Sequence, residues 1–103
     1  MSEIVLTPPY RLDSATAPGF EATSLANIAG SERALIDFSA VDFVSSAGLR
    51  GILMVAKRLR SKGGRLAVCG LRPAVAEVFA ISGFSAILDI HPTRDQALAA
   101  LRQ

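Results

Sequence analysis

The stretch ALIDFSAVDFVSSAGLRGIL, at residues 34–53, contains the two patterns that decide the fold. Its first residues, ALIDFS, are mostly apolar, which is typical of a strand that is covered on both faces of a parallel sheet. After a short loop, apolar side chains recur at intervals of three and four residues, and this spacing predicts an amphipathic helix over residues 47–62. The positions that we expect to face the core are Leu49, Ile52, Leu53, Ala56 and Leu59.

The rest of the chain continues this alternation of strands and helices. Short apolar runs predict further strands at residues 3–7, 65–71 and 86–90. Three more helices are predicted: one that begins near Asp13 or Ser14 and ends by Gly30, one over residues 73–82, and one over residues 94–103 that Thr93 caps. The order predicts an α/β sandwich with a mostly parallel sheet of about four strands and four helices, in a single domain over residues 1–103.

The composition excludes several classes of protein. Half of the 103 residues are hydrophobic, and the longest apolar run is far shorter than the ~20 residues that span a bilayer. The first residues lack the features of a signal peptide, so we expect a cytoplasmic protein without membrane insertion. The single cysteine, Cys69, excludes an internal disulfide, and its apolar strand predicts a buried, unreactive thiol. No spacing typical of metal ligands is present.

Basic residues gather in one part of the chain. Residues 43–76 contain seven lysines and arginines and no acidic residue, whereas residues 1–42 contain six acidic residues and two arginines. The basic segment has two interpretations: a helix face that is simply solvated, or a surface that meets an acidic partner. Nucleic acid is not favoured as that partner, because no aromatic residue interleaves with the cations and no DNA-reading motif is present.

Two adjacent serines precede the predicted helix at residues 47–62. Either Ser45 or Ser46 can cap it by accepting a hydrogen bond from a free backbone N–H group of the first turn. A helix N-terminus also favours anions, so a phosphate on one of these serines is compatible with the fold. We expect Gly48 to leave room there for a partner's backbone or a phosphate oxygen. An exposed stripe suited to partner contact is predicted to contain Arg50, Met54, Lys57 and Arg58.

Catalysis finds little support in the sequence. The segment VSSAG lacks the first glycine of the Gly-x-Ser-x-Gly motif that holds a nucleophilic serine. His91 is the only histidine, and it is expected at the surface or edge of the sheet. We therefore expect neither an enzyme nor a cofactor, and a small hydrolase that uses Ser46 is the least favoured alternative.

Residues 34–53 closely resemble the central segment of STAS domains, specifically of the bacterial anti-sigma factor antagonists. In that family an apolar strand ends in Asp-Leu-Ser, and after a short loop Asp-Ser-(Ser/Thr/Ala)-Gly-Leu opens a helix. The segment GGRLAVCGLRPAVAEVFAISGF, at residues 63–84, resembles the next strand and helix, and YRLDSATA, at residues 10–17, is similar to an earlier Leu-Asp helix start. The resemblance covers nearly the whole chain and implies a STAS-like α/β sandwich.

The resemblance implies a protein whose binding is switched. In the family, the unphosphorylated antagonist binds a serine kinase of the GHKL type that acts as an anti-sigma factor. The kinase inactivates the antagonist by phosphorylating one serine, and a PP2C-type phosphatase reverses the modification. Aligned on Gly48 and Leu49, the phosphorylated serine falls on Ser46, and Asp13 matches an acidic residue near that site. The partner-binding residues expected are Asp13, Ser45, Gly48, Arg50, Met54, Lys57 and Arg58.

Two departures from the family pattern accompany the resemblance. Ser45 stands where an acidic residue usually precedes the phosphoserine, and the chain begins near the family's second strand, which predicts a shortened sheet edge. The alternative function is a STAS subunit of a transporter or of a lipid-transport ATPase that is never phosphorylated. A phosphorylation assay separates the two.

Overall fold

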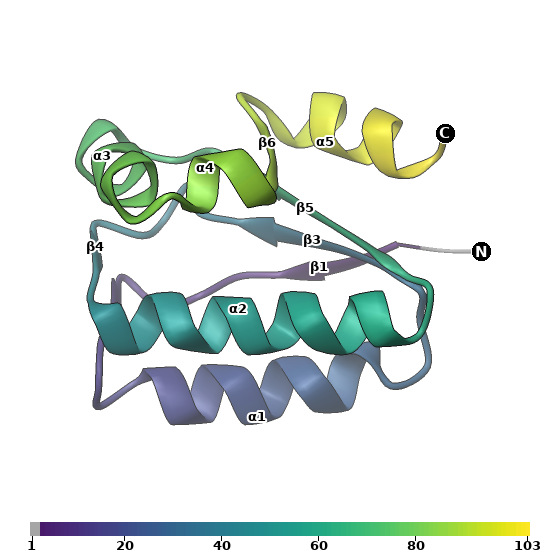
Figure 1. Cartoon of the computed structure of the whole chain (residues 1–103), viewed down its shortest axis with the longest axis horizontal. Helices are drawn as coiled ribbons and strands as arrows, with labels where there is room; N and C mark the ends of the chain where they lie inside the picture. The colour runs from purple at the N-terminus through teal and green to yellow at the C-terminus, as the bar shows by residue number, and fades with distance from the viewer. Residues whose placement is uncertain (1–2) are drawn as a thin grey trace.

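The structure is a computed structural model that describes residues 3–103, in which strands and helices alternate along the chain (Figure 1). The strands are β1 (Ile4–Leu6), β2 (Arg11–Leu12), β3 (Arg33–Asp37), β4 (Phe43–Val44), β5 (Arg65–Cys69) and β6 (Asp89–His91). The helices are α1 (Ala17–Ile28), α2 (Ser46–Ser61), α3 (Pro73–Ser82), α4 (Phe84–Ile87) and α5 (Arg94–Leu101).

Four strands form a parallel sheet in the order β1-β3-β5-β6, as the alternating pattern predicts. In β3, Leu35 lies between Val5 of β1 and Ala67 of β5. The short β6 extends the sheet along the second half of β5. All four strands run in the same direction, and α2 begins at the end of the molecule where β3 finishes (Figure 1).

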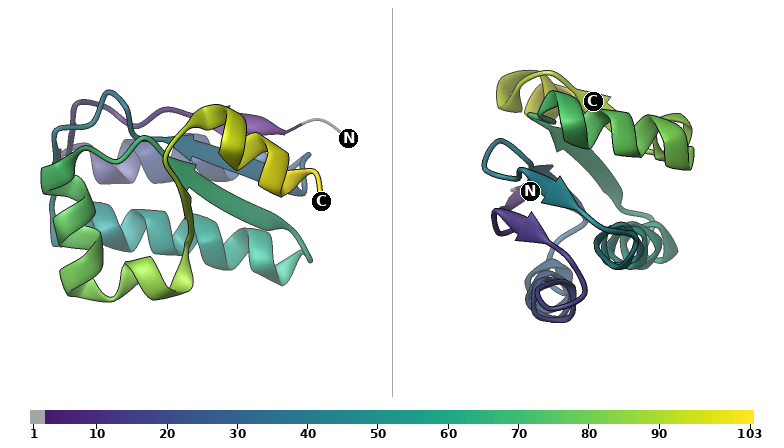
Figure 2. Two further views of the ribbon diagram at one scale, coloured as in Figure 1. Left: turned by 90° about the horizontal axis from the view of Figure 1, so that it is seen from above. Right: turned by 90° about the vertical axis from the view of Figure 1, so that its left-hand side faces the viewer.

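Helices cover both faces of the sheet (Figure 2). Ala34 and Ile36 join a larger core with α1, α2 and α3, whereas Leu35 joins a smaller core with α5. Cys69 belongs to the smaller core and is 1% exposed, which confirms its predicted burial. Burial is the main cause that raises the pKa of the Cys69 thiol to about 11, so the thiol stays protonated and weakly nucleophilic. Within residues 3–103, no helix is both long and apolar enough to cross a membrane.

The predicted helix over residues 47–62 corresponds to α2. The predicted inward positions are buried at Leu49, Ile52 and Leu59 and half-buried at Leu53 and Ala56. Val55, which the sequence analysis did not include, is also buried in this core. The helix ends before Gly63, whose φ of +75° favours glycine over residues with a Cβ atom.

Three details of the predicted secondary structure are wrong. The first helix does not begin at Asp13 or Ser14: residues 13–16 form a turn after β2, which pairs with β4, and Thr16 precedes the first residue of the helix. The strand expected at residues 86–90 begins only at Asp89, because α4 occupies residues 84–87 after Gly83 ends α3. α4 is therefore a helix beyond the four expected. Both β2 and β4 contain two residues and α4 a single turn, too short for a periodic sequence signal.

Candidate functional site

Ser45 is the residue that caps α2. Its Oγ accepts a hydrogen bond from the backbone N–H of Gly48 at 3.3 Å. Its own backbone N–H donates to the carbonyl of Leu12 at 2.9 Å, and its carbonyl accepts from Leu49 at 2.9 Å. Both the hydroxyl and the backbone of Ser45 are therefore used within the fold.

Ser46 has different surroundings although it is the next residue. It is the first residue of α2 and is exposed. Among residues 3–103, its hydroxyl has no hydrogen-bond partner, and neither do the backbone N–H groups of Ser46 and Ala47. The structure thus presents an accessible hydroxyl beside unpaired donors at the positive end of a helix dipole.

Gly48 does not leave room for a partner, and the sequence-based expectation for it is wrong. It is buried, and a Cβ atom at this position would lie 2.4 Å from the carbonyl oxygen of Leu12 and 3.0 Å from its Cγ. The space beside Gly48 is filled by β2, which the sequence analysis did not predict. The glycine is therefore needed for internal packing between α2 and β2.

Asp13 lies in the turn between β2 and α1. Its Oδ1 accepts hydrogen bonds from the backbone N–H groups of Ala15 at 3.0 Å and Thr16 at 3.2 Å. Those two backbone bonds are the main cause that lowers the pKa of the Asp13 carboxyl. Asp13 also lies 3.6 Å from Nε of Arg11. The carboxylate therefore shapes the turn before α1, and no bond joins it to either serine.

An aromatic rim next to the serines was missed by the sequence analysis. Tyr10 and Phe43 are 58% and 39% exposed. The guanidinium of Arg11 stacks 4.3 Å from the centre of the Phe43 ring, and the Tyr10 hydroxyl donates to Oδ2 of Asp42 at 3.0 Å. The sequence does show an aromatic residue, Phe43, two positions before Ser45. The exposure of Phe43, however, follows from the pairing of β2 with β4.

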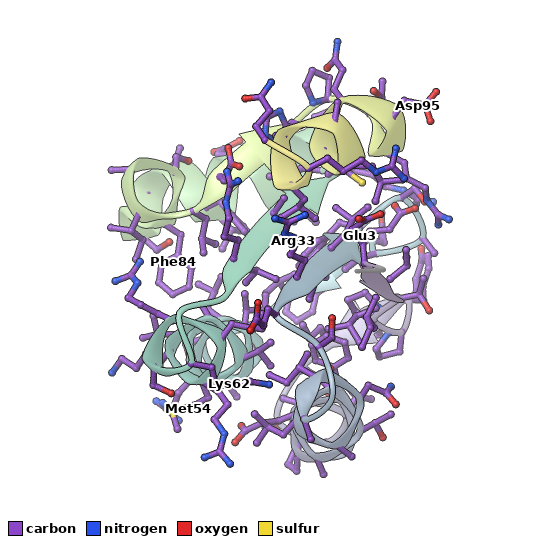
Figure 3. All side chains as sticks on the ribbon, turned by 90° about the vertical axis from the view of Figure 1, so that its right-hand side faces the viewer. Glu3, Arg33, Met54, Lys62, Phe84 and Asp95 are labelled. Carbon is purple, nitrogen blue, oxygen red and sulfur yellow. The ribbon has the colours of Figure 1, made fainter. Side chains whose placement is uncertain are left out.

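The stripe predicted on α2 is exposed. In Figure 3 the side chain of Met54 points away from the sheet, and 43% of the residue is exposed. Arg50, Lys57 and Arg58 are also exposed, and the part of the chain that the structure describes offers their side chains no hydrogen-bond or ion-pair partner. These residues are available for contact with another molecule.

Other cations of the same basic segment serve the fold. Figure 3 shows Lys62, just after α2, turned toward α1. Its ammonium donates to the carbonyls of Ile28, Ala29 and Ser31, at the end of α1 and just beyond it. Arg65 donates to the carbonyl of Gln103 at 2.7 Å, and Arg72 donates to that of Ser39 at 3.0 Å. The segment therefore contains two classes of cation, which its sequence does not distinguish.

A groove of about 530 Å³ lies between α1 and α2, close to the start of α2. Glu21 of α1 and Arg50 of α2 both line it, over a floor that includes Ala17 and Gly51. His91 lies elsewhere, on β6, with its Nε2 2.8 Å from Oδ1 of Asp89, and it makes no contact with either serine. Within residues 3–103, no group of three or more histidine, cysteine or acidic side chains is arranged to hold a metal ion.

Known proteins are similar to this chain in sequence. The family model described as the STAS domain matches residues 2–97. BtrV of Bordetella bronchiseptica, described as an anti-sigma factor antagonist, is 44% identical over 92 residues, which are 88% of this chain and 79% of BtrV.

Solved structures share the fold. An anti-sigma factor antagonist from Mycobacterium paratuberculosis matches with a TM-score of 0.86 and 30% identity, over 96% of this chain and 85% of that one. The phosphorylated form of SpoIIAA, a Bacillus cell fate determinant, matches with a TM-score of 0.72 and 20% identity, over 95% of this chain and 89% of that one.

Proposed function

Because this chain belongs to the STAS domain family, we propose that it is an anti-sigma factor antagonist whose binding is switched by phosphorylation of Ser46. In its unphosphorylated form it binds a GHKL-type serine kinase that acts as an anti-sigma factor. The kinase phosphorylates Ser46 and so releases itself, and a PP2C-type phosphatase restores binding. The chain acts in the cytoplasm as a single-domain binding protein, without catalysis of its own.

The observation that carries this proposal is the division of roles between the two serines. The hydroxyl of Ser45 caps α2, whereas the hydroxyl of Ser46 is exposed and unbonded within residues 3–103. Phosphoryl transfer requires a hydroxyl that can enter a kinase active site, and only the second serine meets this requirement without loss of a cap. Ser46 is therefore the phosphate acceptor in this proposal.

A phosphate on Ser46 is expected to change binding more than folding. It adds about −1.5 to −2 charges at neutral pH. Within the chain, these charges meet the positive end of α2 and the unpaired N–H groups of Ser46 and Ala47, which favours the folded state. Across an interface, the same charges approach a kinase surface that already holds nucleotide phosphates, and that repulsion weakens the complex.

The partner surface extends from Ser46 along the exposed stripe of α2. Arg50, Met54, Lys57 and Arg58 are exposed side by side on this helix, with Met54 as an apolar contact among cations. Ser45 contributes by capping α2, and Asp13 contributes by shaping the turn between β2 and α1. Charge steering then makes association with an acidic partner surface faster at low salt.

Mass spectrometry tests the site. The protein is incubated with ATP and a candidate GHKL-type serine kinase, and the modified residue is identified in the wild type, Ser46→Ala and Ser45→Ala. We expect phosphate on Ser46 in the wild type and in Ser45→Ala, and none in Ser46→Ala. Phosphate on Ser45 would overturn the assignment. Phosphate on neither serine would favour the alternative, a STAS subunit of a transporter or lipid-transport ATPase.

A further inference from the structure

We infer that Arg50 binds the phosphate of phosphorylated Ser46 within the same chain. The modification would then act twice on the partner surface, by adding negative charge at Ser46 and by withdrawing a cation from the stripe. This inference rests on the proposed function, because it concerns the regulation of the same serine. It assigns Arg50 a role that follows from its place on α2 and from the absence of another side-chain partner within residues 3–103.

Ser46 and Arg50 are separated by one turn of α2. Residues four apart on a helix lie on the same face, with their Cβ atoms roughly 6 Å apart. Long side chains on a helix also lean toward its N-terminus. The guanidinium of Arg50 can therefore reach back to a phosphate on the first residue of the helix, and both residues are exposed.

The other arginines of this region already have partners. Arg11 lies 3.6 Å from Asp13 and stacks on Phe43. Arg72 lies 3.7 Å from Asp42 and donates to a backbone carbonyl. The side chain of Arg50, in contrast, has no hydrogen bond or ion pair among residues 3–103. Arg50 can therefore bind a phosphate on Ser46 without losing a side-chain contact, whereas Arg11 or Arg72 would have to break existing contacts.

The chemistry suits an arginine at this position. A guanidinium presents parallel N–H groups that match two phosphate oxygens, and such charge-assisted bonds are stronger than neutral ones. The N–H groups of Ser46 and Ala47 can bind the phosphate from the other side, since no described residue occupies them. Glu21, which carries a negative charge, lines the same groove from α1.

The experiment uses the full chain with phosphoserine placed at position 46 by genetic encoding, so that no kinase is needed. The second pKa of the phosphate is measured by ³¹P NMR in three proteins: the wild type, Arg50→Gln and Arg58→Gln. The control removes the same charge from an exposed residue of α2 about 18 Å along the helix from Ser46, well beyond the ~8 Å screening length at physiological salt. Arg11, Asp13 and Glu21, the charged side chains nearest on β2, its following turn and α1, are unchanged in all three.

We expect Arg50→Gln to raise the phosphate pKa by about half a unit, because the guanidinium stabilises the dianion, and Arg58→Gln to leave it unchanged. Arg50→Lys, which keeps the charge and loses the parallel N–H groups of the guanidinium, should give an intermediate phosphate pKa. Equal values for Arg50→Gln and Arg58→Gln would overturn the inference, as would a full wild-type value in Arg50→Gln with native circular dichroism. Because the phosphate is installed directly, failure of this test is distinct from failure of any kinase to modify Ser46.

Discussion

Two arginines near the beginnings of helices have opposite surroundings. Arg94, the first residue of α5, donates to Oδ2 of Asp37 from Nε at 3.1 Å and from Nη2 at 2.7 Å. Asp37 ends β3 and is only 8% exposed, so this pair ties α5 to the sheet. Arg50 of α2 has no such partner within residues 3–103. Arg94 therefore stabilises the fold, whereas Arg50 is available for binding. We expect substitutions at the start of α5 to change stability and substitutions at the start of α2 to change binding.

The largest expected effect is on binding at the start of α2. Ser46→Asp should weaken the proposed complex with the kinase more than a hundredfold, equivalent to roughly 3 kcal/mol, because a negative charge then faces the partner. Its melting temperature should match that of the wild type, since the same charge is favourable at a helix N-terminus. Ser46→Ala should bind at least as well as the wild type. Calorimetry of the complex measures the affinity, and calorimetry of the free chain measures the melting temperature. A large loss of melting temperature in Ser46→Asp would contradict the expectation that this position controls binding and not stability.

The next largest effect is on stability at the start of α5. Asp37→Ala should lower the free energy of unfolding by about 2–3 kcal/mol, because it removes a nearly buried carboxylate and leaves Arg94 and the backbone N–H of Ser39 without their partner. The side chain of Arg94 is 49% exposed, which keeps the loss below that of a fully buried pair. Urea denaturation measures the change. Asp42→Ala, which removes an exposed carboxylate from an ion pair, is the control and should cost less than about 1 kcal/mol.

A smaller effect on binding is expected along the α2 stripe. Met54→Asp should weaken the kinase complex about tenfold, because it replaces an exposed apolar contact with a charge that opposes an acidic partner. The free energy of unfolding should stay the same. Ala99→Asp adds the same charge on an exposed position of α5 and should leave affinity unchanged. Equal affinities of the two variants would show that the stripe is a solvated face.

The smallest expected effect is the pH dependence of the stability that Asp37 contributes at the start of α5. Burial raises the pKa of the Asp37 carboxyl, but hydrogen bonds from Ser39 and Arg94 outweigh it and hold that pKa below its usual value. The unfolded chain binds this proton more tightly than the folded chain does, so the stabilisation is complete above the unfolded pKa of about 3.9 and is lost as the pH falls below it. Urea titrations between pH 6 and pH 3 should show the wild-type advantage over Asp37→Ala shrinking at the acid end. A constant difference would contradict the role of the ionised carboxylate.

Much of the fold and part of the site could be predicted from the sequence because the signals are local. The three-and-four spacing in residues 47–62 identified α2, and the apolar run at residues 34–39 identified β3. The pair Ser45–Ser46 marked the helix start, although the sequence left open which serine was the cap. The exposure of Arg50 and Met54 followed from the same helical spacing.

The sequence by itself therefore determined the order of elements, the amphipathic faces and the position of two hydroxyls before a helix, because periodicity and capping act within a few residues. Only the tertiary structure decided that Gly48 faces Leu12 and that Asp37 pairs with Arg94. It also decided that Lys62 binds carbonyls at the end of α1, whereas no residue among 3–103 pairs with the side chain of Arg50. Those outcomes depend on contacts between segments 31 to 57 residues apart. Such contacts arise when strands and helices pack, and neither a residue's type nor its neighbours in the chain specify which distant group will meet it.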